Sequence, residues 1–461
     1  MSQYKSIEEL LDAAKKANGH RISDFNVNNR SLTKESKGSI GQIVEEGVFG
    51  YPINSRAEAD FNDLGVELKV TGLKKLKNND YVTKERLVLN IVNYLDEYKT
   101  DFENSSFWKK NKNLLIMFYL YDFDKKDNDF YVIDSILHQF SKTDLEIVKK
   151  DWQDIVDKIK AGKADEISES DTMYLGCCTK GANANSLRKQ PFSDKLAKQR
   201  AFCLKSSYMN SVIKNYFLKE KCEHIATYEE LKQDSLEYII SSKFNKYIGK
   251  SEEDLFKQFN VPLDAKSKFN ILSSRILGIK GNPNNTDEFQ KASIELKTIR
   301  IEENNKIKES MSFPCFKFKE IVNQEWEESD LYNIFSTKKF FFIVFKKING
   351  VYYLEKVKFW NMPALILNNE VKATWEETKK VIKEGDIVKE FKSNKYITNF
   401  PGSSFNGICH VRPHDIKSIE NNPNGGFDLP VPDNYTGLTR YTKQCFWLDR
   451  NYILSIINDQ E

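Results

Sequence analysis

The sequence predicts a mixed α/β fold made of two similar halves, each with a central mixed sheet flanked by helices. Three observations support this prediction. A motif at residues 60–69 recurs at 288–297, with Glu67 and Glu295 in the same place 228 positions apart. Helical and strand-like patterns follow each other in mixed order within each half, which is typical of a sheet covered by helices. The chain also has 461 residues, more than one hydrophobic core usually holds.

The composition is that of a globular protein. Hydrophobic residues make up 40% and charged residues 30% of the chain, which argues against a disordered protein. No apolar run approaches the ~18 residues of a membrane span, and the first residues lack the apolar core of a signal peptide. We therefore expect a cytoplasmic protein with no membrane partner.

Metal binding through cysteine or histidine is not indicated. The seven cysteines show no C-x-x-C spacing and the five histidines are scattered, so neither a zinc site nor a disulfide framework is supported. The net charge of +3 is too small to indicate nucleic-acid binding by itself. These counts leave the function to local motifs.

The first predicted element of the motif region is a helix. Its apolar residues recur at helical spacing and form one stripe, which consists of Ile40, Ile43, Val44 and Val48. Glu45 and Glu46 both lie beside this stripe at similar angles. Periodicity cannot choose between the two acids.

A strand follows at residues 66–69. Apolar and charged side chains alternate there, so Glu67 and Lys69 should project from the same side. The turn-prone residues 62–65 let Asp60 return to that edge. Two carboxylates at one place suit a hard divalent cation, and an amine beside them can orient a water molecule or offset charge developing on a phosphodiester. A solvated strand face carries the same alternation, so E-x-K alone is weak evidence.

The boundary between the halves is placed near residue 225. Residues 219–255 are mixed and strongly charged, and Ser251 begins a Ser-Glu-Glu-Asp sequence that resembles a capping box at the start of a helix. We therefore predict two domains, 1–225 and 226–461. Within the second, Asn349-Gly350 separates two β-rich stretches and predicts a tight hairpin.

The residues around the first motif resemble a known nuclease family. Gly-Ser-Ile-Gly41-Gln-Ile-Val-Glu45, followed by Ala-Asp60-Phe-Asn-Asp-Leu-Gly-Val-Glu67-Leu-Lys69, is similar to the MutH mismatch-repair nucleases and to the GATC-cutting type II restriction endonucleases of the same family. The resemblance implies two restriction-endonuclease-like domains arranged as a pseudo-dimer. It also implies Mg²⁺-dependent cleavage of duplex DNA.

The same resemblance implies an active site in the first half. The family carries a third carboxylate on the helix before the motif; counting from Gly41 selects Glu45, whereas counting back from Gly50 selects Glu46, and we predict Glu45. Lys110 stands where the family has a further active-site lysine, with Lys109 and Lys112 as neighbouring alternatives. The expected catalytic residues are thus Glu45, Asp60, Glu67, Lys69 and Lys110, with Glu45, Asp60 and Glu67 as ligands of Mg²⁺.

A DNA-reading loop is implied by Lys180, Gly181 and Asn183. Residues 180–219 contain nine Lys or Arg and one acid, a local surplus that suits phosphate contacts, although a solvated basic helix face is the alternative interpretation. The family implies a guanine contact for Lys180. The family's Arg-Pro-Lys is here Cys178-Thr179-Lys180, so its base contacts are not carried over in detail.

The second half repeats the scaffold with altered chemistry. The 228-residue offset puts Ser273 and Ser274 where the first half has its helix acids, and it replaces Asp60 by the longer Glu288. Such a site should bind a metal ion weakly and position water poorly. We therefore predict that this half is catalytically inactive.

The second half nonetheless keeps candidate DNA contacts. Arg412, Pro413 and His414 resemble the Arg-Pro-Lys loop of the family, with an ordinary surface turn as the alternative. Arg412 can contact a guanine edge at two atoms. We hypothesise that this half binds a second DNA site and activates cleavage.

Taken together, these features predict a type II restriction endonuclease that cleaves duplex DNA at GATC-like sites. We expect a monomer in solution; cleavage of two strands requires either a dimer on DNA or sequential cuts by one chain. Two alternatives stay open. One is a strand-nicking repair nuclease of the MutH kind, and the other is a non-catalytic DNA-binding regulator on the same scaffold.

Overall fold

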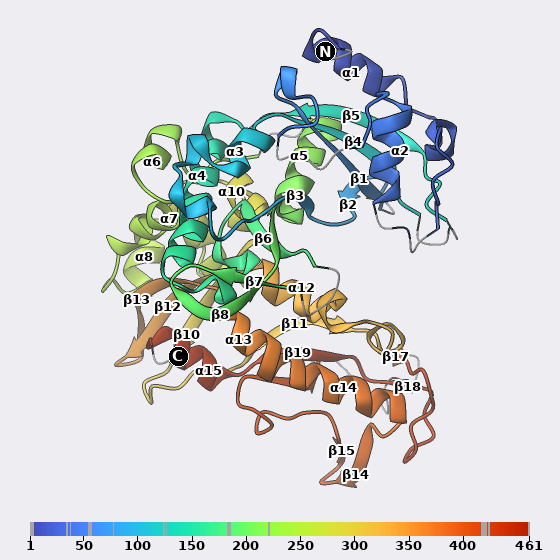
Figure 1. Ribbon diagram of the computed structural model, residues 1–461. Helices are drawn as coiled ribbons and strands as arrows, with labels where there is room; N and C mark the ends of the chain where they lie inside the picture. Colours follow the sequence, from blue (N-terminus) through green and yellow to red (C-terminus); the bar gives the residue numbers. More distant parts are fainter. Residues whose placement is uncertain are drawn as a thin grey trace. The chain divides into compact units, whose positions relative to one another are not determined.

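The computed structural model describes residues 4–33, 36, 38–53, 58–76, 78–122, 125, 127–181, 186–219, 222–415, 422 and 425–459. The chain divides into two compact units (Figure 1). Unit 1 consists of Met1–Ile239 and Asn285–Ser293, and unit 2 of Ile240–Asn284 and Ile294–Glu461. The chain therefore leaves unit 2 after residue 284, contributes one short segment to unit 1, and returns at residue 294.

Unit 1 contains a four-stranded mixed sheet in the order β2-β1-β4-β5. Strand β1 (Glu67–Lys75) pairs in parallel with β4 (Leu114–Leu120), while β2 (Tyr81–Thr83) and β5 (Val132–His138) are antiparallel to their neighbours. Helix α2 (Ser39–Gly47) buries Ile43 and Val44 in the core beside this sheet, because its apolar residues lie on one face. The predicted helix and strand of the motif region are both present.

A second, three-stranded sheet of unit 1 has the order β3-β9-β6. It consists of β3 (Leu87–Ile91), β9 (Arg200–Leu204) and β6 (Leu175–Thr179), and β7 (Leu187–Gln190) forms a hairpin with β8 (Ser193–Lys198). The other α-helices of this half are α1 (Ile7–Lys15), α3 (Ser106–Asn111), α4 (Lys142–Lys160), α5 (Ser206–Leu218) and α6 (Tyr228–Gln233).

Unit 2 repeats this plan. Its first sheet has the order β10-β12-β13, with β10 (Ile294–Ile301) parallel to β12 (Lys339–Ile348) and β13 (Val351–Trp360) antiparallel. Its second sheet is β11-β19-β16, consisting of β11 (Met311–Phe316), β19 (Gln444–Leu448) and β16 (Cys409–Pro413). The β3–β9 and β11–β19 pairs each contain a register shift. The prediction of two related mixed α/β halves is therefore confirmed.

The remaining elements of the second half are mainly helices. They are α7 (Leu236–Asn245), which crosses from unit 1 into unit 2, α8 (Glu252–Gln258), α9 (Lys268–Leu277), α11 (Phe318–Ile321), α12 (Asp330–Thr337), α13 (Ala364–Ile366), α14 (Lys372–Glu384) and α15 (Arg450–Ile457), with strands β14 (Val388–Lys392), β15 (Lys395–Thr398), β17 (Phe427–Asp428) and β18 (Arg440–Tyr441). The Asn349-Gly350 hairpin is confirmed, because both residues have positive φ, 50° and 85°, as this turn requires. Ser251 caps α8, accepting a hydrogen bond from the Asp254 N–H.

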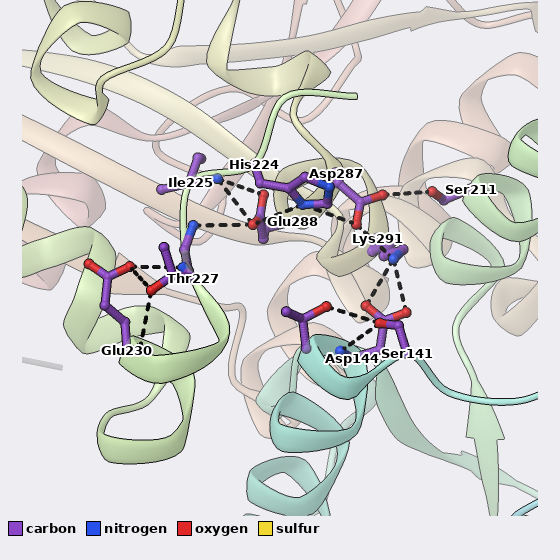
Figure 2. A network of polar contacts seen from close by, with 12 residues as sticks. Ser141, Asp144, Ser211, His224, Ile225, Thr227, Glu230, Asp287, Glu288 and Lys291 are labelled. Carbon is purple, nitrogen blue, oxygen red and sulfur yellow. Dashed lines mark hydrogen bonds and ion pairs between the residues drawn. The ribbon is translucent and has the colours of Figure 1, made fainter. Parts of the chain in front are cut away.

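Helix α10 (Asp287–Ala292) is the segment that the chain contributes to unit 1 (Figure 2). The Lys291 ammonium lies 2.8 Å from a carboxylate oxygen of Asp144 on α4 and 2.7 Å from one of Asp287. Ser211 on α5 donates a hydrogen bond to Asp287 over 3.2 Å. The Glu288 carboxylate accepts hydrogen bonds from the Ile225 and Ala226 N–H groups. Polar contacts of α10 are thus made with several parts of unit 1.

No helix within the described part of the chain is both long enough and apolar enough to cross a lipid bilayer.

Candidate active site

Asp60, Glu67 and Lys69 are held together at the start of β1. A 3₁₀ turn, Asn62–Leu64, ends at Gly65 with φ of 61°, and it brings the chain back to the strand edge. The Asp60 N–H donates to Glu67 Oε2 over 3.2 Å, and the Leu68 N–H donates to Asp60 Oδ2 over 3.0 Å. Lys69 Nζ lies 2.7 Å from Glu67 Oε1. Strand alternation and the turn therefore place two acids and an amine side by side.

Lys110 reaches the same carboxylate from helix α3. Ser105 caps this helix by accepting a hydrogen bond from the Trp108 N–H, which is a common way to begin a helix. Lys110 lies in the last turn of α3, with its Nζ 3.6 Å from Glu67 Oε1. Glu67 is only 3% exposed while the two lysines are about one-sixth exposed, so solvent reaches these lysines more easily than it reaches the Glu67 carboxylate.

The two acids of helix α2 have different surroundings. The Glu46 carboxylate accepts two hydrogen bonds from one edge of the Arg30 guanidinium, from Nε at 2.7 Å and from Nη2 at 2.8 Å, and these hydrogen bonds lower its pKa to about 2. Burial, together with the negative charges of Asp60 and Glu67, raises the pKa of Glu45 to about 7. Glu45 is therefore the helix acid that shares the electrostatic field of the strand acids. This geometry favours Glu45 over Glu46.

The fit of a divalent cation can be judged from these carboxylates. Among the residues that the structure describes, no three His, Cys, Asp or Glu side chains converge closely enough to hold a metal ion, and one Glu67 oxygen is engaged by Lys69. Burial and the charge of Asp60 nevertheless raise the pKa of Glu67, as the neighbouring acids do for Glu45. Such crowding of negative charge is relieved by a cation, and an all-oxygen donor set suits Mg²⁺. The chemistry of these donors therefore suits such an ion, although among the described residues no three of them converge on one point.

Replacing Glu45 by glutamine should distinguish the two helix acids. We expect Glu45→Gln to lower the rate of DNA cleavage on the order of 100-fold, because a group that stabilises developing charge through the ion is lost. Glu46→Gln, the matched control, should keep most of the rate, because its partner is Arg30. Single-turnover cleavage by both variants is the measurement. A larger loss in Glu46→Gln would reverse the assignment.

The structure corrects the counterpart of Asp60 in unit 2. Glu288, the residue expected there, lies on α10 and hydrogen-bonds to Ile225 and Ala226 in unit 1. Instead, the Leu296 N–H donates to Asn284 Oδ1 over 3.3 Å, as the Leu68 N–H donates to Asp60. The two partners are 12 positions apart in unit 2 and 8 in unit 1. Helix α10 occupies the longer segment of unit 2, so the constant offset of 228 residues selected the wrong residue. The neutral amide of Asn284 stands in unit 2 where unit 1 has the Asp60 carboxylate.

The rest of the unit 2 site keeps its basic residues. Lys297 Nζ lies 2.7 Å from Glu295 Oε1, and Lys338 forms an ion pair with the other Glu295 oxygen. Lys338 was not predicted, although it lies 228 positions after Lys110 and that spacing could have revealed it. Burial raises the pKa of Glu295, but hydrogen bonds from the two lysines outweigh this effect and leave the pKa below its ordinary value.

The helix acids have no counterpart in unit 2. Ser273 and Ser274 on α9 are buried, and their hydroxyl groups donate to the carbonyl oxygens of Phe269 and Asn270 in the preceding helical turn. Either residue could correspond to Glu45, and both are uncharged. Among the described residues, unit 2 therefore has one acid, Glu295, at the positions where unit 1 has Glu45, Asp60 and Glu67.

The candidate DNA-reading loops occupy equivalent positions. The Lys180 N–H donates to the Gln199 carbonyl, and the His414 N–H donates to the Lys443 carbonyl, each over 2.9 Å and each just after an antiparallel strand. His414 is thus the structural counterpart of Lys180. Asn183 lies outside the described residues, whereas Gly181 follows Lys180 at the surface.

The exposed end of β16 carries three of the candidate DNA-binding residues. Arg412, Pro413 and His414 are all exposed there. The Arg412 guanidinium lies 5.8 Å from the centre of the Trp447 ring, and the His414 ring meets the same tryptophan edge-on at 5.6 Å. Trp447 therefore supports two of the three side chains.

Known proteins resemble this chain in both halves. The family model described as "DNA mismatch repair enzyme MutH" matches residues 49–151 and 277–344. The type II restriction enzyme Sau3AI of Staphylococcus aureus is 38% identical, over 100% of both chains. The DNA mismatch repair proteins MutH of Shewanella woodyi and Pasteurella multocida are each 26% identical, over 46% and 40% of this chain and 93% and 82% of their own.

Proposed function

The chain belongs to the family of the type II restriction enzyme Sau3AI, within the MutH-like nucleases, and on this premise we propose that it hydrolyses both strands of duplex DNA at GATC-like sites with Mg²⁺ bound in unit 1. Restriction endonuclease activity is the property of the family. The observation that carries the assignment to unit 1 is the hydrogen-bonded group of Asp60, Glu67 and Lys69, with Lys110 on the same carboxylate.

Each side chain of unit 1 has a distinct part in the proposed reaction. Asp60, Glu67 and Glu45 would hold the ion, which when bound supplies Lewis-acid polarisation of the phosphodiester and acidifies a water molecule. Lys69 orients the attacking water, because its ammonium stands on the face where Glu67 projects. Lys110 offsets negative charge that develops on the phosphate. The hydrogen bond between Leu68 and Asp60 holds the second acid in place.

The second half is proposed to bind DNA without cutting it. Asn284 and the two helix serines remove the acids that a hydrolytic ion requires. Lys180 and Gly181, with Asn183, would contact bases in the first half, and Arg412, Pro413 and His414 in the second. A guanidinium can donate to two acceptors of a guanine in the major groove, and an ammonium to the same edge. Catalysis is thus assigned to 1–225, which also contacts bases, and DNA binding without catalysis to 226–461.

Plasmid cleavage tests this function. The full chain is incubated with Mg²⁺ and plasmids that carry one or two GATC sites, unmethylated or methylated, and the ends are sequenced. Linear products cut within or beside GATC support the proposal, and nicked circles would favour a MutH-like nicking activity. Intact plasmid in every reaction would favour a non-catalytic regulator.

The number of sites tests the role of the second half. If this half binds another site and activates cleavage, the two-site plasmid should be cut faster than the one-site plasmid at equal DNA concentration. Equal rates would contradict activation. We propose that the protein is a monomer in solution, and light scattering without DNA tests this. The same measurement with a one-site duplex shows whether two chains or one chain bind the site. Two chains would indicate a dimer on DNA, and one chain would indicate sequential cutting of the two strands.

A further inference from the structure

The two equivalent sites differ in their charge. In unit 1, Glu45, Asp60 and Glu67 face Lys69 and Lys110, and because the pKa of Glu45 is raised to about 7, the net charge near neutral pH lies between zero and one negative charge. In unit 2, Glu295 faces two lysines, Lys297 and Lys338, and one positive charge is in excess. Without an ion, a DNA phosphate would therefore be attracted to the second site but not to the first.

The two lysines of unit 2 are available to a ligand. Lys297 is 28% exposed and Lys338 is 33% exposed, whereas Glu295 between them is 25% exposed. Each ammonium has three hydrogen-bond donors, and each makes an ion pair with Glu295. A phosphate approaching from solvent therefore meets donor groups on both sides of a single carboxylate.

A basic cavity of unit 2 shares Lys297 with this site, whereas Lys338 lines a separate cavity. It has a volume of about 700 Å³, and the cations lining it are Lys297, Arg300, Lys306, Lys308, Lys347 and Arg450. Two carboxylates also line it, those of Glu302 and Glu309. Glu302 is engaged internally, because Tyr352 donates a hydrogen bond to it over 2.7 Å and Lys347 lies 3.8 Å away. The wall of the cavity therefore keeps a surplus of positive charge next to Lys297.

We propose that the inactive site of unit 2 is a metal-independent binding site for the phosphate backbone of duplex DNA. Lys297 and Lys338 contact a phosphate directly there, at the position equivalent to the one where unit 1 would bind a phosphate through an ion. The basic cavity beside Lys297 takes a neighbouring phosphate. This inference rests on the proposed function, since it assigns DNA as the ligand of the second half. It goes further in stating which side chains bind the backbone and that no cation is needed.

Duplex DNA suits this surface better than a small anion. Lys297 lies on β10, in the position that Lys69 occupies on β1, where the phosphodiester must lie for hydrolysis in unit 1. A chain of phosphates can use the site and the cavity together, whereas one phosphate ion can use only one of them. Neutralised phosphates release condensed counterions, so the contact should depend strongly on salt.

Binding to a short labelled duplex in EDTA tests the inference, with the full chain throughout. Wild type should bind without a divalent cation. In the double variant Lys297→Ala and Lys338→Ala, the slope of log affinity against log salt should shrink by about two, because two phosphate contacts are lost. The control with Lys297→Arg and Lys338→Arg keeps both charges and should keep the slope, which shows that charge and not folding is responsible.

A second variant tests the sign of the charge. Asn284→Asp adds a carboxylate to the unit 2 site, so binding in EDTA should weaken, and Ca²⁺ should restore it. The inference is overturned if wild type requires a divalent cation to bind, or if the double alanine variant binds in EDTA with an unchanged slope. Cleavage in Mg²⁺ by the same preparations separates the two proposals. If DNA is cut normally and the double alanine variant keeps the wild-type salt slope, only the phosphate site is refuted. If DNA is not cut and the salt slope shrinks as expected, only the nuclease assignment is refuted.

Discussion

Replacing Glu67 by alanine is expected to abolish DNA cleavage and to leave DNA binding by the full chain largely intact. Glu67 is the carboxylate on which the candidate site converges, because the Asp60 N–H, Lys69 and Lys110 all contact it. Its loss would remove a proposed metal ligand and the carboxylate that both lysines contact. We expect the single-turnover rate to fall by ~10³-fold, since charge stabilisation in the transition state is lost, while ground-state affinity is not.

Glu295→Ala is the matched control for this change. Glu295 has the equivalent place on β10 and an equivalent lysine, Lys297, at 2.7 Å, but no group of acids that could hold an ion with it is found among the described residues. Cleavage should therefore persist in Glu295→Ala. Lys69→Ala should lose cleavage like Glu67→Ala, and it should still bind the site. Complete loss of cutting in Glu295→Ala, with Glu67→Ala still active, would exchange the roles of the two units.

The second large effect is expected on stability, from Lys291→Ala. Lys291 is 8% exposed and is paired with Asp144 and Asp287, which are 9% and 6% exposed (Figure 2). Removing the ammonium leaves the buried Asp144 without its lysine and leaves Asp287 with the exposed His224 ring at 3.8 Å. Removing one partner of a buried ion pair typically costs about 3–5 kcal/mol. We expect unit 1 to unfold at lower urea concentration, and hydrogen exchange in α4 and α5 should follow that transition.

Neutral replacements provide the control for the buried network. If the cost of Lys291→Ala comes from uncompensated charge, combining Lys291→Met with Asp144→Asn and Asp287→Asn should recover much of the stability, because an uncharged set is cheaper to bury than a broken ion pair. Lys317→Ala, which removes a lysine that is 57% exposed, should hardly move the transition. If Lys291→Ala and Lys317→Ala lowered the stability equally, the contacts of α10 would not stabilise unit 1.

Local patterns anticipated those features of the fold that depend on neighbouring residues. The alternation at 66–69 is a strand with Glu67 and Lys69 on one side, and Asn349-Gly350 forms the expected hairpin. The repeated motif predicted two similar halves, and each half has a mixed sheet and a second three-stranded sheet. Each of these depends on backbone preferences and side-chain periodicity within a few residues, which a sequence displays directly.

Choices among nearly equivalent residues depended on distant partners. Glu45 and Glu46 are adjacent, and their periodicity is the same; Arg30, sixteen positions before Glu46, is what separates them. The offset of 228 predicted Glu288 as the counterpart of Asp60 in the second half. Helix α10 occupies the chain between Asn284 and β10, and Asn284 is the counterpart instead. An insertion that folds into a helix cannot be recognised from a constant spacing.

The sequence by itself determined the two-fold repetition, the secondary structure around each motif and the grouping of Asp60, Glu67 and Lys69, because these follow from residue type and spacing along the chain. The choice of Glu45 and Lys110 came from the resemblance to the MutH family. Only the tertiary structure decided that Asn284 takes the place of Asp60 and that Glu288 belongs to the network of unit 1; it also showed the ion pair of Lys338 with Glu295, which the 228-residue spacing could have suggested. The physical reason is that hydrogen bonds and charge fields act over a few ångströms in space, between residues that lie tens of positions apart in the chain.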